Sequence, residues 1–269
     1  MTAVRDVRAV RSTPNGSEPV ADALVVEAPL HIKVNGAAWT TTMRTPGADC
    51  ELARGLLLTE GIVTDLDAGV EFHEVPDPET GLVACLETWI DESRVEKEVE
   101  GRRTLMSSSS CGVCGVREPQ DLEVYGPPIS MPESVTLNAV EISRMMASMR
   151  ARQALFTATG GAHAAAVFDG RGEMMAIFED IGRHNAVDKA IGALIFEGRL
   201  EEARYLMVSG RVSFEIVSKA YRAAIPTVCS VSAASSMAVD TAVRMGMTLA
   251  AFCRDAQATV YTGQERIMP

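Results

Sequence analysis

The first third of the chain places apolar residues at the spacing of β-strands. Residues 24–27 and 30–34 are rich in Val, Leu and Ile, and an Asn35-Gly36 pair before residues 39–43 is typical of a hairpin turn. Apolar residues at helical spacing then predict a helix over residues 49–58. Shorter apolar runs predict three further strands, over residues 70–75, 82–88 and 95–99.

The second half of the chain alternates short apolar runs with helical segments. An amphipathic period predicts a helix over residues 137–153, and we interpret its row of methionines (Met145, Met146 and Met149) as core. Five strands are predicted after it, over residues 164–168, 174–179, 204–209, 227–232 and 248–253. Helices are predicted between them, over residues 185–196, 213–223 and 236–245. A β-α-β-α-β order indicates a parallel sheet covered by helices, so we expect an α/β fold class.

These patterns divide the chain into four segments. Residues 1–19 hold arginines and a turn cluster but no apolar run, so we expect a disordered arm and no signal sequence. An N-terminal α+β lobe is expected over residues 20–106, a mobile cysteine loop over 107–120, and an α/β/α cofactor-binding lobe over 121–269. No apolar stretch reaches the roughly 18 residues that a membrane-spanning helix requires, so we expect no membrane association.

Composition narrows the classes of function. The net charge of −11 argues against nucleic-acid binding, because phosphate contacts need a basic surface. An anionic ligand would have to meet a local basic pocket. The six cysteines lack the dense spacing of a disulfide framework, which indicates reduced thiols and a cytoplasmic protein.

Two cysteines, Cys111 and Cys114, stand three positions apart between glycines, after a run of serines. A structural zinc site would need further ligands nearby, and the other cysteines and the histidines stand singly, so we expect no permanent metal. A thioredoxin-type dithiol would sit at the start of a helix, whereas small residues flank this pair. We interpret the pair as loop thiols that carry or transfer sulfur, with a plain redox dithiol as the alternative.

Small, cationic and hydroxyl residues follow the strands predicted for the second lobe. The carboxyl ends of parallel strands share one edge, where ligands bind, and glycine amides with cations there bind phosphate. The candidates that follow strands are Gly182, Arg183, His184, Ser209, Gly210, Arg211 and Arg254, and those that precede a strand are Gly160, Gly161 and His163. No phosphate-binding P-loop or dinucleotide fingerprint is present, which argues against a nucleoside triphosphatase or a dehydrogenase.

The motifs together resemble those of one known family, the formate dehydrogenase accessory sulfurtransferases (FdhD). The matching segments are residues 111–115, 159–163, 179–189, 209–211 and 252–254. The resemblance implies a cytidine deaminase-like three-layer α/β/α lobe, although the zinc motif of the deaminases is missing. It also implies a carrier that takes persulfide sulfur from a cysteine desulfurase. That sulfur would pass to the molybdenum of Mo-bis(molybdopterin guanine dinucleotide) before apo formate dehydrogenase receives this cofactor.

The same resemblance assigns roles to individual residues. Cys111 matches the persulfide-bearing cysteine, and Cys114 is its partner. The family's cofactor-binding segment maps onto Phe252, Cys253, Arg254, Asp255, Ala256 and Gln257. We also expect a homodimer. The alternative function is a non-enzymatic chaperone that binds the cofactor or the apo-dehydrogenase and uses its cysteines only for redox sensing.

Overall fold

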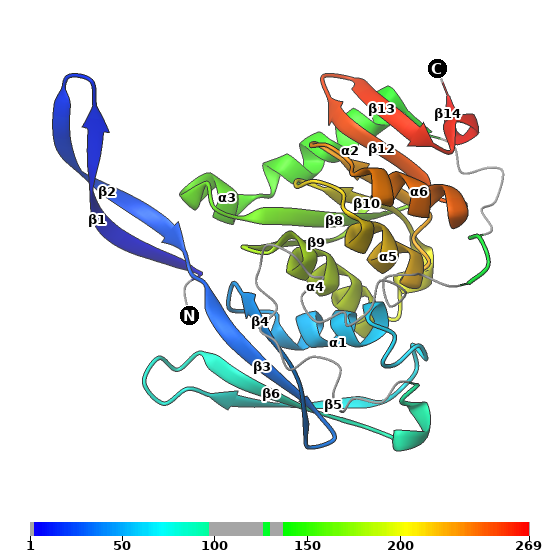
Figure 1. Cartoon of the computed structure of the whole chain (residues 1–269), viewed down its shortest axis with the longest axis horizontal. Helices are drawn as coiled ribbons and strands as arrows, with labels where there is room; N and C mark the ends of the chain where they lie inside the picture. The colour runs from blue at the N-terminus through cyan, green and yellow to red at the C-terminus, as the bar shows by residue number, and fades with distance from the viewer. Residues whose placement is uncertain (1–2, 97–125, 130–136, 269) are drawn as a thin grey trace.

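The computed structural model of the chain describes residues 3–96, 126–129 and 137–268. Its larger lobe is built on a six-stranded sheet with the order β13-β12-β11-β10-β8-β9 (Figure 1). The three central strands are parallel: β10 (Ala203–Val208), β11 (Thr227–Ser230) and β12 (Thr248–Arg254). They are joined by two helices, α5 (Phe214–Arg222) and α6 (Ser236–Arg244). The predicted β-α-β-α-β order is confirmed.

Antiparallel strands extend this sheet at both sides. On one side lie β8 (His163–Asp169) and β9 (Met174–Asp180), and on the other lies β13 (Gln257–Thr262). The prediction that residues 248–253 form the last strand is wrong. Asp255 and Ala256 both have positive φ, so they form a tight turn from β12 into β13. Asn-Gly or Asp-Gly usually marks such a turn, and alanine at its second position hides it from the sequence.

Helices cover both faces of the sheet. On one face lies α2 (Ala139–Ala151), where Met145, Met146 and Met149 are buried, so their assignment to the core is confirmed. On the other face lie α5, α6 and α4 (Arg183–Phe196). The three-layer α/β/α prediction is therefore confirmed. A short helix that was not predicted, α3 (Ala154–Thr159), follows α2. The short strands β7 (Leu137–Asn138) and β14 (Ile267–Met268) pair beside the main sheet.

The smaller lobe packs a four-stranded sheet against one helix, α1 (Asp49–Thr59). Its strands are β3 (Ala28–Val34), β4 (Ala37–Arg44), β5 (Val70–Pro76) and β6 (Val83–Ile90). Alternate residues of β3 (Leu30, Ile32 and Val34) are buried in its core, and Asn35 and Gly36 have positive φ, so the hairpin prediction is confirmed. The strand predicted over residues 95–99 is not seen: Val95 and Glu96 follow a short 3₁₀ helix (Glu92–Arg94), and residues 97–99 lie outside the described residues.

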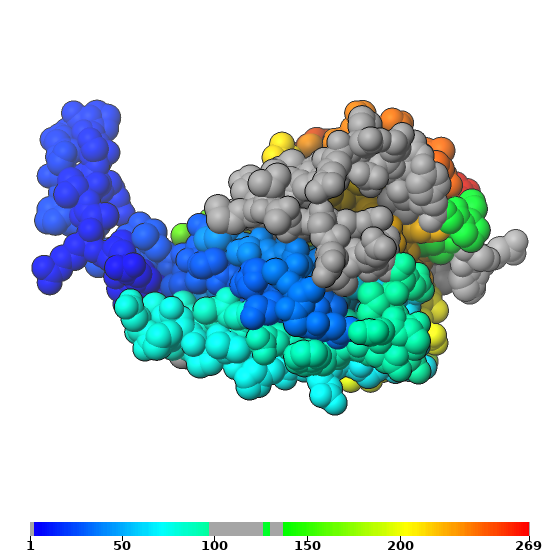
Figure 2. Space-filling model, turned by 60° about the horizontal axis from the view of Figure 1, so that its bottom comes forward, coloured from blue at the N-terminus to red at the C-terminus, as the bar shows by residue number. Residues whose placement is uncertain are grey.

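The N-terminal residues form a hairpin, so the prediction of a disordered arm over residues 1–19 is wrong. β1 (Val4–Thr13) and β2 (Gly16–Val25) pair along their whole length and project from the body (Figure 2). The turn cluster noted in the sequence joins them, and residues 20–25 belong to this arm rather than to the α+β lobe. Most residues of the ribbon are exposed on both faces, so the sequence carries no clear apolar alternation there.

The two lobes meet where α1 packs against α4 (Figure 1). A Cβ atom on Gly55 of α1 would overlap the carbonyl oxygen of Asp188, and one on Gly192 of α4 would overlap that of Glu51. Both glycines therefore allow backbone contact between the helices. This contact fixes the small lobe against the middle of α4, a helix that begins beside the carboxyl edge of the main sheet.

Candidate functional site

A cavity of about 630 Å³ lies at the carboxyl edge of the main sheet. β8 begins at this cavity, β10 and β12 end at it, and the end of α2 and the start of α3 form its other wall. Seven of the residues predicted from the sequence line it: Gly160, Gly161, His163, Ser209, Cys253, Arg254 and Asp255. A volume of this size suits a ligand as large as a nucleotide.

Backbone pairing between β8 and β10, together with the small residue Gly210, brings His163 to the cavity wall. Ala164 donates its backbone N–H to Ser209 Oγ (2.8 Å), and Ser209 donates its own to the carbonyl of Ala164 (3.0 Å). A Cβ atom on Gly210 would lie 3.2 Å from His163 Nδ1 and 3.2 Å from Arg183 Cδ, so glycine lets the two side chains approach. Burial and the charge of Arg183 lower the pKa of His163, which favours a neutral imidazole at pH 7.

At the end of β12, a bulge places a thiol on the cavity wall. Phe252 has a positive φ of 53°, and the pairing with β13 shifts register between Ala251 and Arg254. Cys253 therefore packs on the α2 side of the sheet, whereas Phe252 is 41% exposed. A hydrogen bond with the Cys229 thiol of β11 lowers the pKa of Cys253. The bulge thus presents a sulfur atom and the Arg254 side chain together at the cavity.

The structure does not bring every predicted ligand residue into this cavity. The predicted residues that do not line it are Gly182, Arg183, His184, Gly210, Arg211, Phe252, Ala256 and Gln257. Arg183 and Gly210 lie directly behind His163, and Arg211 is exposed. His184 lies toward α5, where its Nε2 is 2.8 Å from Glu215 Oε2 and 3.4 Å from Ser213 Oγ. Their predicted role in binding the cofactor stays a prediction.

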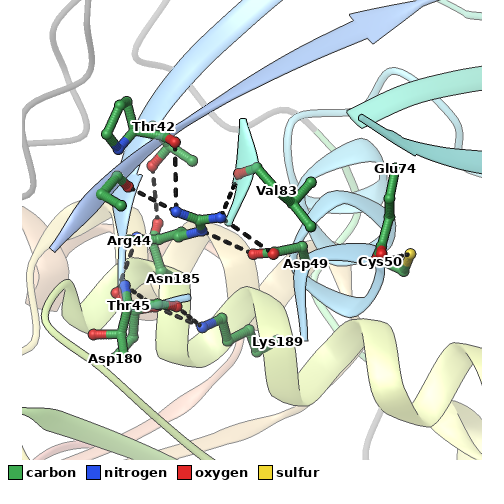
Figure 3. Close-up of polar contacts among 12 residues, drawn as sticks. Thr42, Arg44, Thr45, Asp49, Cys50, Glu74, Val83, Asp180, Asn185 and Lys189 are labelled. Atoms are coloured by element: carbon green, nitrogen blue, oxygen red, sulfur yellow. Dashed lines mark hydrogen bonds and ion pairs between the residues drawn. The ribbon is translucent and has the colours of Figure 1, made fainter. Parts of the chain in front are cut away.

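The segment from Asp180 to Lys189 holds the lobes together. The Asp180 carboxylate lies 2.7 Å from Lys189 Nζ and accepts backbone N–H groups from Gly182 (2.8 Å) and Thr45 (3.1 Å), as Figure 3 shows in part. Lys189 also donates to the carbonyl of Thr45 (2.8 Å). Asn185 Nδ2 donates to Asp180 Oδ1 (3.1 Å) and to a carbonyl of β4 (2.8 Å). Burial raises the pKa of the Asp180 carboxyl, against the attraction of Lys189.

Two further buried ion pairs lie near this segment, one within each lobe. Lys219 of α5 lies 2.8 Å from Asp188 and donates to Thr59 Oγ1 of α1 (3.0 Å), so it links three helices. Arg44 donates to both oxygens of Asp49 (2.8 and 3.2 Å) at the start of α1 (Figure 3). Most of the polar residues in this segment therefore stabilise the interface between the lobes, which the sequence did not indicate.

Sequence reasoning missed the residues that α2 and α3 contribute to the cavity. The Arg150 guanidinium lies 4.8 Å from the centre of the Phe156 ring. Gln153, which connects the two helices, is only 4% exposed and lines the cavity. Its sequence position, at the end of a predicted helix, gives no sign of this placement.

Some predictions cannot be placed in the structure. Cys111 and Cys114, with the whole loop 107–120, lie outside the described residues. Within the described ranges, no three His, Cys, Asp or Glu side chains are grouped so as to hold a metal ion, and the absence of a permanent metal stays a prediction. None of the helices in the described part of the chain is long and apolar enough to cross a membrane.

Fold and cavity together define a three-layer α/β/α protein with a nucleotide-sized site at the carboxyl edge of its sheet. The sequence profile of the FdhD/NarQ family matches residues 25–268. The chain belongs to this family, which confirms the resemblance seen in its motifs.

Individual relatives agree with this membership over nearly the full length. The sulfur carrier protein FdhD of Mycobacterium bovis is 41% identical over 273 residues, which cover 99% of this chain and 98% of that protein. The protein of the same name from Corynebacterium efficiens is 42% identical over 252 residues, 90% of each chain. The crystal structure of a formate dehydrogenase accessory protein from Desulfotalea psychrophila shares the fold, with a TM-score of 0.77 at 22% identity over 99% of this chain and 100% of that chain.

Proposed function

We propose that this chain is a sulfurtransferase that carries sulfur to a molybdenum cofactor for formate dehydrogenase. The name of its relatives, sulfur carrier protein FdhD, supports the carrier role. The cargo would be Mo-bis(molybdopterin guanine dinucleotide), loaded with sulfur before the apo-dehydrogenase receives it. The observation on which the proposal depends most is the cavity, because a carrier for this cargo needs a nucleotide-sized site at which the acceptor is held.

The proposed sulfur step is a nucleophilic transfer to Cys111. Its thiolate attacks the outer sulfur of a cysteine desulfurase persulfide, so that a new S–S bond forms while the desulfurase cysteine leaves as a thiolate. An unperturbed thiol with a pKa of about 8.5 is only a few per cent ionised near pH 7, so cationic neighbours would speed the step. Cys114 is the partner thiol that relays or resolves this sulfur.

The chemistry of the cavity wall fits one nucleotide portion of such a cargo. Arg254 offers a cation, and Gly160 and Gly161 allow backbone to come close to a phosphate. The floor is apolar and rich in sulfur, since Met146, Met149 and Cys253 lie along it. Charge-assisted contacts of this kind are needed in a chain with a net charge of −11, which otherwise repels anions.

The remaining parts of the proposal rest on the family alone. The partners would be a cysteine desulfurase and apo formate dehydrogenase, the chain would act as a homodimer, and the reaction would take place in the cytoplasm.

Sulfur loading is tested by intact-mass spectrometry after incubation with a desulfurase and cysteine. Wild-type protein should gain the mass of at least one sulfur atom, and Cys111→Ala should not. Cys85→Ala, which removes a thiol of the small lobe, is the matched control and should load like the wild type. Equal loading of Cys111→Ala and wild type would contradict the assignment. No gain by any of them would favour the redox-sensing chaperone.

Cargo binding is tested by calorimetric titration with GDP as a stand-in for half of the cofactor. A cation on phosphate contributes roughly 1.5–3 kcal/mol, so Arg254→Ala should weaken GDP binding about tenfold or more. Arg222→Ala, at the far end of α5, is the matched control. The same titration with Arg183→Ala and Arg211→Ala shows whether the bound nucleotide extends beyond the cavity. Unchanged affinity in Arg254→Ala would place the phosphates elsewhere.

A further inference from the structure

Gln153 is a buried polar side chain whose amide has no hydrogen-bond partner among the residues that the structure describes. It is 4% exposed, and it borders the cavity. Buried amides in folded proteins are almost always paired. The amide atoms of Gln153 are not among the fully enclosed, unpaired atoms of the described residues, so they reach the cavity, where solvent or a ligand can pair with them. An amide that stays unpaired at the wall of a cavity is therefore suited to a ligand.

The backbone around Gln153 is fixed, which leaves the side chain as the available group. Its N–H donates to the carbonyl of Arg150 (3.3 Å) at the end of α2. Its carbonyl accepts the backbone N–H (3.0 Å) and the hydroxyl (2.7 Å) of Thr157 in α3. The residue is thus held from both helices, and its amide forms no hydrogen bond to the rest of the chain that the structure describes.

Flat and polarisable groups line the same cavity as this amide. Arg150 and Phe156 form a cation–π pair, and Met146 and Met149 line the same cavity. Guanidinium planes, aromatic rings and thioether sulfurs all make favourable contacts with planar heterocycles. A side-chain amide presents one donor and one acceptor side by side, which matches the edge of a purine or of a related bicyclic ring.

We propose that the Gln153 side-chain amide is the base-reading group of this cavity, forming paired hydrogen bonds with the edge of a purine-like heterocycle. The inference rests on the proposed cargo site and adds the residue that recognises the ring of the bound nucleotide. The phosphates are held independently, by Arg254 and the glycine backbone.

Calorimetric titration of the full-length chain with GDP, ADP and inorganic pyrophosphate separates these parts. Gln153→Leu should weaken GDP binding about tenfold or more, as expected for loss of a paired contact to a base, and leave pyrophosphate binding unchanged. Gln264→Leu, which removes an amide near the C-terminus that bonds to Tyr261, is the matched control and should bind GDP like the wild type.

A second variant of Gln153 tests which hydrogen-bonding groups the bound base presents to this residue. A carboxylate offers two acceptors, which fit the adjacent N–H groups of guanine, whereas the adenine edge also needs a donor. Gln153→Glu should therefore raise the ratio of GDP affinity to ADP affinity above its wild-type value. A ratio that stays the same, or falls, would count against a base edge at this position.

Thermal unfolding distinguishes a ligand-reading amide from a structural one. Because the Gln153 amide has no hydrogen-bond partner in the described part of the chain, its removal in Gln153→Leu should leave the melting temperature equal to or higher than that of the wild type. A lower melting temperature with unchanged GDP affinity would overturn the inference and leave the cargo site standing. Absence of both GDP and pyrophosphate binding in the wild type would overturn the cargo site and the inference together.

Discussion

The cavity wall and the segment from Asp180 to Lys189 lie at the same edge of the sheet and contain the same kinds of polar residue, yet they differ in how fully those residues are paired. Asp180 and Lys189 are buried and meet each other and the backbone of Thr45. Within the part of the chain that the structure describes, the side chains of Gln153 and Arg254 meet no such partner. Hydrogen-bond saturation, rather than residue type, separates the groups that hold the lobes together from those that are free to bind.

The largest expected loss of stability follows from replacing Asp180, a fully hydrogen-bonded residue of the segment from Asp180 to Lys189. Asp180→Ala leaves the Lys189 ammonium buried without its carboxylate, which should lower the free energy of unfolding by about 3–5 kcal/mol. Urea denaturation measures this loss. Asp240→Ala, which replaces an exposed acid of α6, should change the free energy by less than about 0.5 kcal/mol.

A double variant sharpens the same test. Because Asp180→Leu with Lys189→Met removes both charges, its loss of stability should be smaller than the sum of the two single losses. Additive losses would show that the two residues act independently, and the interpretation of Asp180 and Lys189 as a coupled pair that together binds the backbone of Thr45 would not hold.

A somewhat smaller loss of stability is expected at the backbone contact between α1 and α4, where the two lobes meet. Gly192→Ala places a methyl group on the carbonyl oxygen of Glu51, so α1 and α4 must separate. Overpacking of this kind costs about 1–3 kcal/mol, again measured by urea denaturation. Gly69→Ala is the matched control, because a Cβ atom there meets nothing within 4 Å. Equal stability of the two variants would mean that the helices are not in tight contact.

The smallest expected effect is a dependence of stability on pH that originates at the cavity. The folded chain lowers the pKa of His163, so the folded state binds this proton less readily than the unfolded state, whose histidines titrate near about 6.5. The stabilisation is present above that pH and is lost as the pH falls through the folded pKa.

Unfolding curves of wild type and His163→Asn between neutral and mildly acidic pH measure this contribution. The variant should lose less stability than the wild type over that range. His73→Asn, which replaces an exposed histidine of β5, is the control and should follow the wild-type curve. Parallel curves for His163→Asn and wild type would contradict the shift.

The spacing of apolar residues along the chain explains how much of the fold could be predicted. Strands such as β10 and β11 are short, mainly apolar runs that are buried along nearly their whole length. Amphipathic helices separate them, so their order and parallel pairing follow from the sequence. The N-terminal ribbon has no buried face, and the turn at Asp255 and Ala256 uses an alanine at positive φ, so neither leaves a recognisable pattern.

The site could be predicted only in part, for a related reason. Strand ends with glycine and cations identified the correct edge, because parallel strands end together. The bond from Thr45 to Asp180 spans 135 residues of sequence, and no local pattern indicates it. That the Gln153 amide has no partner among the described residues is likewise a property of the folded structure alone.

The central claim is that the cavity beside β8, β10 and β12 holds the nucleotide portion of the cargo, and a crystal structure of the chain with GDP tests it most directly. The prediction is a purine edge within hydrogen-bonding distance of the Gln153 amide, with phosphate oxygens near Arg254 and the backbone of Gly160 and Gly161. A second hollow exists at the other end of the sheet, lined in part by Pro127, Tyr221 and Arg222. GDP bound in that hollow, with the cavity at Gln153 left empty, would contradict the claim.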